Sequence, residues 1–382
     1  MYNEGWPLYI HSAIFITAGV LVAVVGIRLA RYAQQFARRT GLGQALTGAL
    51  FLGASTSLSG IITSITAAAG GHPELAASNA VGGIAAQTVF LAIADRVYSK
   101  ANLEHAAASD ENMLQGSLLI ALLSLALLTT ATPAYALWGV HPVTVLLLGG
   151  YILGQRLVYQ AQEKEMWRPR MTEHTHTGEA ESLSSDSREN PYEGENASPH
   201  RQQARGGTET VSDTVSNDNG SSAKESFAAL SIKFFTLALV LGFLGYLLAS
   251  SGVTVAEKTG FNETVLGGIF TAVSTSFPEL VTAVAAVRMG ALTLAVSDII
   301  GGNAFDMIFL AVADFAFREG SLYHAMGTRP TFLIMLTILL TSVLLLGLIR
   351  REKHGIANIG FESMLLLLIY AGGFTLLVTV MG

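Results

Sequence analysis

Residues 274–306 read STSFPELVTAVAAVRMGALTLAVSDIIGGNAFD, and residues 55–87 read STSLSGIITSITAAAGGHPELAASNAVGGIAAQ. These stretches belong to one longer self-match, because residues 48–95 align without gaps on residues 267–314 when the chain is shifted by 219 positions. Nineteen of the 48 aligned positions are identical, including Ser-Thr-Ser, Gly-Gly and Phe-Leu-Ala-x-Ala-Asp in register. An apolar composition alone would produce matches of Ala and Leu, but not of these runs, so the match indicates an internal repeat.

Around the repeat, the chain has the composition of a membrane protein. It is 51% hydrophobic and only 13% charged, whereas soluble domains are about 25% charged. A spanning helix needs about 20 mainly apolar residues. Ten stretches meet this requirement: 7–30, 43–69, 75–98, 114–136, 140–160, 228–251, 264–289, 291–317, 331–349 and 361–380. The predicted fold class is an all-α integral membrane protein with ten transmembrane helices.

The segment between the fifth and sixth stretches has a different composition. Residues 161–227 are rich in Ser, Glu, Asn, Gly and Thr and nearly free of large apolar side chains. Such a segment cannot bury enough apolar surface to offset the entropy of ordering. We therefore expect a first five-helix repeat at 1–160, a disordered linker at 161–227 and a second five-helix repeat at 228–382.

The number of helices between the two copies fixes their relative direction. Five helices separate the copies, and because five is odd the second copy should enter the membrane from the opposite side. Inverted repeats of this kind are typical of secondary transporters, whose binding site lies near the midplane where the copies meet.

The distribution of basic residues predicts the orientation. If the N-terminus is outside, 19 of the 22 Lys and Arg residues lie on the inner side, and the excess remains 10 to 3 without the linker-side residues. Inner loops of membrane proteins carry such an excess. We expect an integral protein of the plasma (inner) membrane with both termini outside and a cytoplasmic linker.

Two segments of the second copy carry polar chemistry within apolar surroundings. Pro278 lies mid-helix in the predicted span and should free a backbone carbonyl beside Glu279. A carboxylate at this depth is a functional hypothesis by default. The alternative is a structural kink with Glu279 paired to a buried base, but no Lys or Arg lies at comparable depth in the sequence.

The second segment contains Asn303 and Asp306, which are three residues apart and therefore on one helical face. With Glu279 they form a set of oxygen ligands without imidazole or thiolate. Hard cations such as calcium, sodium or magnesium prefer this set, and transition metals do not. Both carboxylates can also take up protons when no cation is bound.

These residues resemble the calcium/cation antiporter superfamily, the family of sodium/calcium exchangers. Its repeats carry Gly-Thr-Ser-x-Pro-Glu followed by Gly-Asn-x-x-Gly-Ser-Asn-x-x-Asn/Asp. Residues 274–279 and 297–306 match both segments, with Ser274 for the first Gly, Ser-Asp for Gly-Asn and Gly302 for Ser. The resemblance implies that Glu279 and Asp306 are the central ion ligands. It also implies that Thr275, Ser276 and Asn303 support them, partly through backbone oxygens.

The first repeat departs from the family pattern. Ser59 replaces the proline, Gly60 replaces the acidic ligand and Ile84 replaces an Asn. The polar candidates that remain in this copy are Thr56, Ser57 and Gln87. With one glutamate missing, the site can suit calcium if water or Asp298 helps. It can equally suit one or two monovalent cations, or a cation exchanged for protons.

Three other acids have an open role. Asp298 stands where the family has Asn, and it faces either the ion pathway or a structural hydrogen bond. Asp95 and Asp314 lie near helix ends beside Arg96 and Arg318, so a structural interfacial role is the favoured interpretation for them.

The sequence thus predicts a secondary active cation antiporter that moves Ca²⁺ against Na⁺ or H⁺ by alternating access. It is not expected to be an enzyme or to need a cofactor. The chain has no cysteine, which excludes thiolate metal sites and cysteine nucleophiles, and it has no Gly-Lys-Ser/Thr phosphate loop that would suggest ATP use. The expected partners are inorganic cations and membrane lipid, not nucleic acid. The alternatives are a monovalent cation/proton antiporter of altered stoichiometry, a passive cation pathway and a non-transporting ion sensor.

Overall fold

The computed structural model describes residues 6–41, 43–98, 103, 107, 109–163, 226–259, 271–350 and 360–380. Nearly all of this part of the chain is helical, and the one β feature within it is an isolated bridge between Leu137 and Val140. The predicted all-α fold class is therefore confirmed. The predicted linker falls almost wholly on residues 164–225, which lie outside the described residues.

Eight described helices are long and apolar enough to cross a membrane, and a bent pair adds a ninth span. The eight are α1 (Leu8–Thr40), α5 (Pro73–Val97), α7 (Asp110–Thr130), α8 (Pro142–Glu163), α10 (Phe227–Lys258), α14 (Leu292–Ala316), α16 (Thr328–Arg350) and α17 (Phe361–Val380). The bent pair joins Gln44–Thr56 to Leu58–Ala69 at an angle of 48°. The remaining predicted span, 264–289, begins outside the described residues. Its described part consists of α12 (Ala272–Thr275) and α13 (Phe277–Arg288).

Several helix ends differ from the predicted spans, for identifiable reasons. Helix α1 continues ten residues past the predicted end, to Thr40, because Arg and Gln propagate a helix well after the apolar run stops. It ends at Gly41, whose left-handed backbone (φ 69°) closes the last turn. Helix α7 ends at Thr130, six residues early, because Pro133 disfavours helical backbone at the residue before it.

The helices occur in pairs that repeat the 219-residue shift of the sequence. Helices α1 and α10 begin at Leu8 and Phe227, and α8 and α17 begin at Pro142 and Phe361. Helix α4 (Leu58–Ala69) and α13 both contain 12 residues, while α5 and α14 both contain 25. In each pair the second helix starts 219 residues after the first. The repeat therefore extends to helices outside the aligned sequence.

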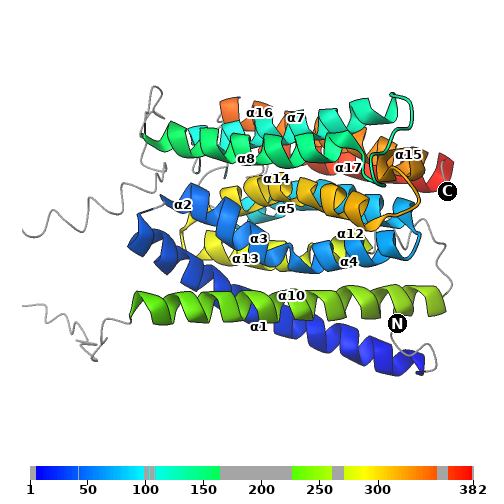
Figure 1. Cartoon of the computed structure of the whole chain (residues 1–382). Helices are drawn as coiled ribbons and strands as arrows, with labels where there is room; N and C mark the ends of the chain where they lie inside the picture. Colours follow the sequence, from blue (N-terminus) through cyan, green and yellow to red (C-terminus); the bar gives the residue numbers. More distant parts are fainter. Residues whose placement is uncertain are drawn as a thin grey trace, which may run out of the picture.

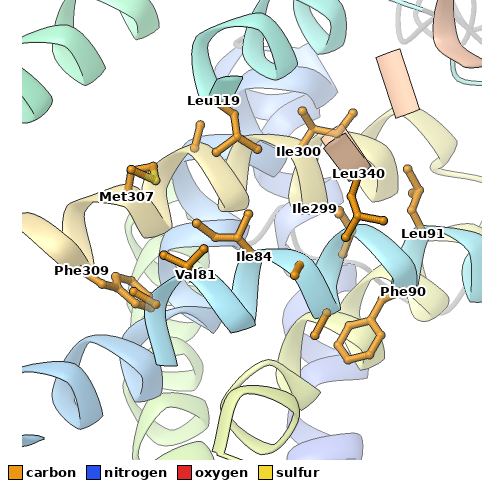
Figure 2. Close-up of a cluster of buried hydrophobic side chains, with 14 of the residues drawn as sticks. Val81, Ile84, Phe90, Leu91, Leu119, Ile299, Ile300, Met307, Phe309 and Leu340 are labelled. Atoms are coloured by element: carbon orange, nitrogen blue, oxygen red, sulfur yellow. The ribbon is translucent and has the colours of Figure 1, made fainter. Parts of the chain in front are cut away.

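Helices α5 and α14 form the centre of the molecule. Figure 1 shows α1 and α10 together on one side of them and α7, α8 and α16 on the other. In an apolar stretch of 18 residues from each helix, the buried share is 94% for α5 and 72% for α14. The corresponding share is 33% for both α1 and α10. Figure 2 shows Val81 and Ile84 of α5 in one cluster with Ile299, Ile300 and Met307 of α14.

Glycines allow the π-helix η1 (Thr47–Gly53) to approach α14 closely. A Cβ at Gly48 would lie 2.8 Å from the carbonyl oxygen of Leu294, and one at Gly53 would lie 2.8 Å from Cα of Gly302. A Cβ at Gly301 would overlap Ala49. Close backbone approach at small residues is how membrane helices pack, since lipid offers no hydrophobic drive. This contact sets the position of the residues that follow on α14.

Asp314 ties the end of α14 to the start of α8. Its Oδ1 accepts a bond from the backbone N–H of Leu322 at 2.8 Å. Its Oδ2 accepts from the backbone N–H of His141 at 2.8 Å and from the Thr144 hydroxyl at 2.6 Å. The side chain is fully buried.

Asp95, the repeat counterpart of Asp314, makes the equivalent contacts. Its Oδ1 accepts from the N–H of Leu103 at 2.7 Å, and its Oδ2 accepts from the N–H of Gly360 at 3.2 Å, directly before α17. Each aspartate therefore anchors the loop after its own helix and the last helix of the other repeat. Both have the structural role that the sequence favoured, through backbone N–H groups and, for Asp314, the Thr144 hydroxyl, rather than through Arg96 or Arg318.

Candidate functional site

The two Ser-Thr-Ser segments form the breaks at which the candidate site is built. Ser57 (φ −74°, ψ −5°) separates α3 (Ala54–Thr56) from α4, and Ser276 (φ −90°, ψ 1°) separates α12 from α13. The prediction that Pro278 lies mid-helix is wrong, because it occupies the first turn of α13, where its missing N–H has no intrahelical partner to lose. The same break occurs in the first repeat without a proline, so the packing of the two segments holds it.

The breaks place two acids close to the first repeat. Glu279 lies in the first turn of α13 and Asp306 in the middle of α14, each 1% exposed. The Ser57 hydroxyl donates to Oε1 of Glu279 at 3.3 Å. The Gln87 amide donates from Nε2 to Oδ2 of Asp306 at 2.7 Å and to the Ser276 hydroxyl at 3.2 Å. The structure therefore brings together five of the residues that the sequence singled out.

The site lies where equivalent positions of the two repeats meet. Gln87 and Asp306 are counterparts, 219 residues apart, and they bond directly to each other. Ser57 and Ser276 are counterparts as well, and each contacts a polar side chain of the other repeat. Ser57 donates to Glu279, and Ser276 accepts from Gln87. Both halves of the chain are therefore needed to form the site.

Within the described residues, this region holds an unusual number of buried acceptor oxygens without a donor. They are Oε1 of Gln87, Oε2 of Glu279, Oδ1 of Asp298, Oδ1 of Asn303 and Oδ1 of Asp306. The buried polar side chains of the described chain include no Lys or Arg. A buried acceptor without a donor destabilises a fold by about 1–3 kcal/mol, and a charged acceptor by more. A cation or a proton is what would satisfy this set.

Two predicted hydroxyl ligands are directed elsewhere. The Thr56 hydroxyl bonds to the carbonyls of Leu52 and Gly53 at 3.2 and 2.9 Å. The Thr275 hydroxyl lies 3.1 Å from Oδ1 of Asn79 and also reaches carbonyls of its own helix. In this conformation both hydroxyl protons are thus used within or between the broken-helix segments rather than toward the acids.

Asn303 is held from the first repeat. Its Nδ2 donates to the Thr88 hydroxyl at 3.0 Å, which leaves Oδ1 as one of the unpartnered acceptors. Because Thr88 follows Gln87, the α5 segment that contacts Asp306 also orients Asn303. Asn303 and Asp306 lie three residues apart on α14, as the helical spacing predicted.

Asp298 stands one step away from the two central acids. Its Oδ2 accepts from the Thr282 hydroxyl at 2.6 Å, and Thr282 lies one turn after Glu279 on α13. No three His, Cys, Asp or Glu side chains of the described ranges come close enough to share a metal ion. In this conformation Asp298 therefore has one hydrogen-bonded oxygen and one oxygen without a donor. It does not form a three-carboxylate group with Glu279 and Asp306.

Sequence reasoning missed four residues that support the site. Ser59 donates to the carbonyl of Thr275 at 3.1 Å, and Asn79 donates to the carbonyl of Gly60 at 3.1 Å. Thr88 and Thr282 make the bonds described above. Thr282 was detectable from its i, i+3 spacing to Glu279 and Asn79 from its place opposite Asp298 in the repeat, whereas nothing in the sequence identifies the partner of Ser59.

Comparison with known proteins adds a family and a fold. A family model described as sodium/calcium exchanger protein matches residues 10–155 and 230–380. CaxA, a proposed antiporter of Alkalimonas amylolytica, is 32% identical over 146 residues, which is 36% of this chain and 43% of that protein. Sodium/potassium/calcium exchanger 5 of Homo sapiens is 29% identical over 117 residues, 30% of this chain and 23% of that protein. Sodium/potassium/calcium exchanger 2 of Gallus gallus is 36% identical over 76 residues, 20% of this chain and 12% of that protein. The matched stretches thus span less than half of each relative.

Solved structures agree on the fold. The sodium-calcium exchanger NCX_Mj soaked with 2.5 mM Na⁺ and 0.1 mM Ca²⁺ aligns with a TM-score of 0.64 at 15% identity, covering 96% of this chain and 98% of that chain. The same exchanger soaked with 10 mM Na⁺ and no Ca²⁺ gives a TM-score of 0.63 at 14% identity, covering 97% and 99%. At this identity the likeness concerns the fold alone.

Proposed function

The chain belongs to the sodium/calcium exchanger protein family, and from this premise we propose that it is a secondary active cation antiporter whose substrate binds at Glu279 and Asp306. It is an integral membrane protein, and the family comprises transporters rather than enzymes. The proposed exchange moves Ca²⁺ against Na⁺ or H⁺ by alternating access, with the cation as substrate and no cofactor.

The observation that carries this proposal is the group of buried, unpartnered acceptor oxygens, with no buried Lys or Arg among the described residues. Calcium takes six to eight oxygen ligands. Side-chain oxygens of Glu279, Asp306, Asn303 and Gln87 supply part of such a shell. The Ser57 hydroxyl contacts Glu279 and the Ser276 hydroxyl contacts Gln87, so both hydroxyls can add to it.

The repeat pairs supply the means of alternating access. Inverted repeats that meet at a binding site allow one half to rock against the other, so that the site opens to each side in turn. The direct contact between Gln87 and Asp306 crosses this boundary. An ion that neutralises Asp306 and a counter-ion that replaces it would act on the same contact.

The proposed orientation places both termini outside and the linker in the cytoplasm of a plasma-membrane protein. Figure 1 supports it in one respect, because the two chain ends lie at one end of the helical bundle. The ends of α8 and α10 that flank residues 164–225 lie at the other end.

A second candidate is a monovalent cation/proton antiporter with altered stoichiometry. It is favoured by Gly60, which stands at the first-repeat position equivalent to Glu279 and supplies no carboxylate. A site with two acids balances one divalent or two monovalent charges, so the comparison of ions decides between the candidates.

The test is ion flux in proteoliposomes in which Ca²⁺, Na⁺, K⁺ and H⁺ gradients are varied one at a time. We expect Ca²⁺ uptake that requires an opposing Na⁺ or H⁺ gradient, and its loss in Glu279→Gln and in Asp306→Asn. Ser297→Ala is the matched control, because Ser297 is buried on α14 but donates to Asn112, away from the acids. Flux without an opposing gradient would indicate a passive pathway, and ion binding without flux would indicate a sensor.

A further inference from the structure

Gly60 marks the place of a side chain that the first repeat lacks. It is the third residue of α4, as Glu279 is the third residue of α13, so repeat symmetry assigns it the position of a second glutamate. Gly60 is buried, and its carbonyl is held by the Asn79 amide at 3.1 Å. The backbone at this point is therefore fixed by a bond to α5.

The ring of Phe309 fills the space beside Gly60. A Cβ at Gly60 would overlap Cε2 of Phe309 and would lie 3.0 Å from its Cζ and 3.3 Å from its Cδ2. Phe309 is 3% exposed. It follows Asp306 by three residues on α14, which puts both on one face of the helix. The ring thus contacts the backbone position that would carry the missing acid, about one helical turn from Asp306.

The position of Glu279, the counterpart of Gly60, shows that a phenylalanine on the facing helix does not by itself exclude an acid. Phe90 is the counterpart of Phe309 and follows Gln87 by three residues on α5, as Figure 2 shows at the opposite side of the cluster. Phe90 and Glu279 are both buried, on helices α5 and α13, which pack against each other. A phenylalanine is therefore present at both equivalent places, and an acid at only one of them.

We propose that Phe309 is a specificity-determining residue, whose ring closes the first-repeat half of the cation site and limits the site to one bound cation. This inference rests on the proposed function. An aromatic ring has no lone pair for a hard cation, so all carboxylate oxygens of the site lie on the Glu279 and Asp306 side. A single Na⁺ then competes with a single Ca²⁺, whereas a larger site would let several Na⁺ ions compete with one Ca²⁺.

The first measurement is calcium binding to the purified full chain in detergent, with Na⁺ as competitor and choline as the balancing ion. The wild-type protein is expected to bind one Ca²⁺, with Na⁺ competing at a Hill coefficient near 1. A Hill coefficient clearly above 1 would overturn the proposal, because it requires a second Na⁺ within the site.

The second measurement combines Gly60→Glu with Phe309→Ala. Gly60→Glu alone should lower the melting temperature without tightening Ca²⁺ binding, because the ring occupies the space of the new side chain. The double variant should recover melting temperature relative to Gly60→Glu, bind Ca²⁺ at least tenfold more tightly than wild type, and show steeper Na⁺ competition. Tighter binding in Gly60→Glu alone, equal to that of the double variant, would overturn the proposal.

Two controls keep the result interpretable. Phe90→Ala makes the same change in the other repeat, so its combination with Gly60→Glu should not restore melting temperature, and rescue there would count against the proposal. If Gly60→Glu does not fold, Gly60→Ala with and without Phe309→Ala tests the same contact. If Glu279→Gln leaves wild-type ion binding unchanged, the proposed function fails, which is a separate outcome from failure at Phe309.

Discussion

Gln87 offers a direct test of how charge at the repeat interface sets ion preference. Its Nε2 donates to Oδ2 of Asp306 at 2.7 Å, and its Oε1 is one of the unpartnered acceptors. Gln87→Glu keeps the length of the side chain and converts the donor into a carboxylate oxygen. The variant therefore places two repeat-related acids face to face.

The magnitude follows from Coulomb's law. A unit charge about 4 Å from the added carboxylate is stabilised by about 4 kcal/mol at an effective dielectric constant of about 20, and a divalent ion by about twice that. Repulsion from Asp306 and burial of the new charge are the same whichever ion binds, so they cancel in the ratio of affinities. The difference of about 4 kcal/mol corresponds to about a thousandfold, and screening should leave at least about tenfold.

The assay is calorimetric titration with Ca²⁺ and competition with Na⁺ for wild type, Gln87→Glu and Gln87→Leu. Gln87→Glu should raise the ratio of Ca²⁺ to Na⁺ affinity at least about tenfold. Gln87→Leu removes the amide without adding charge, so it should weaken both ions and leave the ratio within about threefold. A folded Gln87→Glu protein with the wild-type ratio would refute the placement of Gln87 at the cation.

Three further predictions concern the contacts that hold the helices together. Asp314→Asn and Asp95→Asn should each lower the free energy of unfolding by about 3 kcal/mol, because an amide cannot accept on both sides, while Ca²⁺ affinity of the folded protein stays unchanged in titration. Gly301→Ala should abolish accumulation of folded protein, judged by size-exclusion chromatography, because its Cβ would overlap Ala49; Gly372→Ala, with nothing within 4 Å, should not. Burial and the neighbouring His324 lower the pKa of His141 below 6.5. Below that pH the unfolded chain binds a proton that the fold resists, so the melting temperature should fall less between pH 7.5 and 5.5 in His141→Gln than in wild type.

The class of fold was predictable because membrane-spanning helices must satisfy their own backbone. Apolar run length therefore predicts helices directly, and the self-match anticipated the paired helix lengths. The helix breaks were less predictable. Pro278 drew attention to one break, yet Ser57 breaks the first repeat without a proline, because the hydrogen bonds that hold it come from residues distant in the chain.

The candidate site was predictable to the extent that polar residues in apolar surroundings are rare. Glu279, Asp306 and Gln87 stood out by this criterion. In the structure Gln87 bonds to Asp306, and Glu279 accepts from Ser57 of the first repeat. Phe309 did not stand out, because an aromatic residue in an apolar run is consistent with ordinary packing. Its contact with Gly60 joins two helices whose register no local pattern encodes.

The exchange of last helices between the repeats has a consequence for biogenesis. Asp95 waits for a backbone donor at Gly360, which the ribosome adds 265 residues later. At about 5–20 residues per second this interval is on the order of tens of seconds. In a nascent first half, Leu103 can therefore already bond to Oδ1 of Asp95, while Oδ2 lacks its Gly360 donor until the start of α17 has been made.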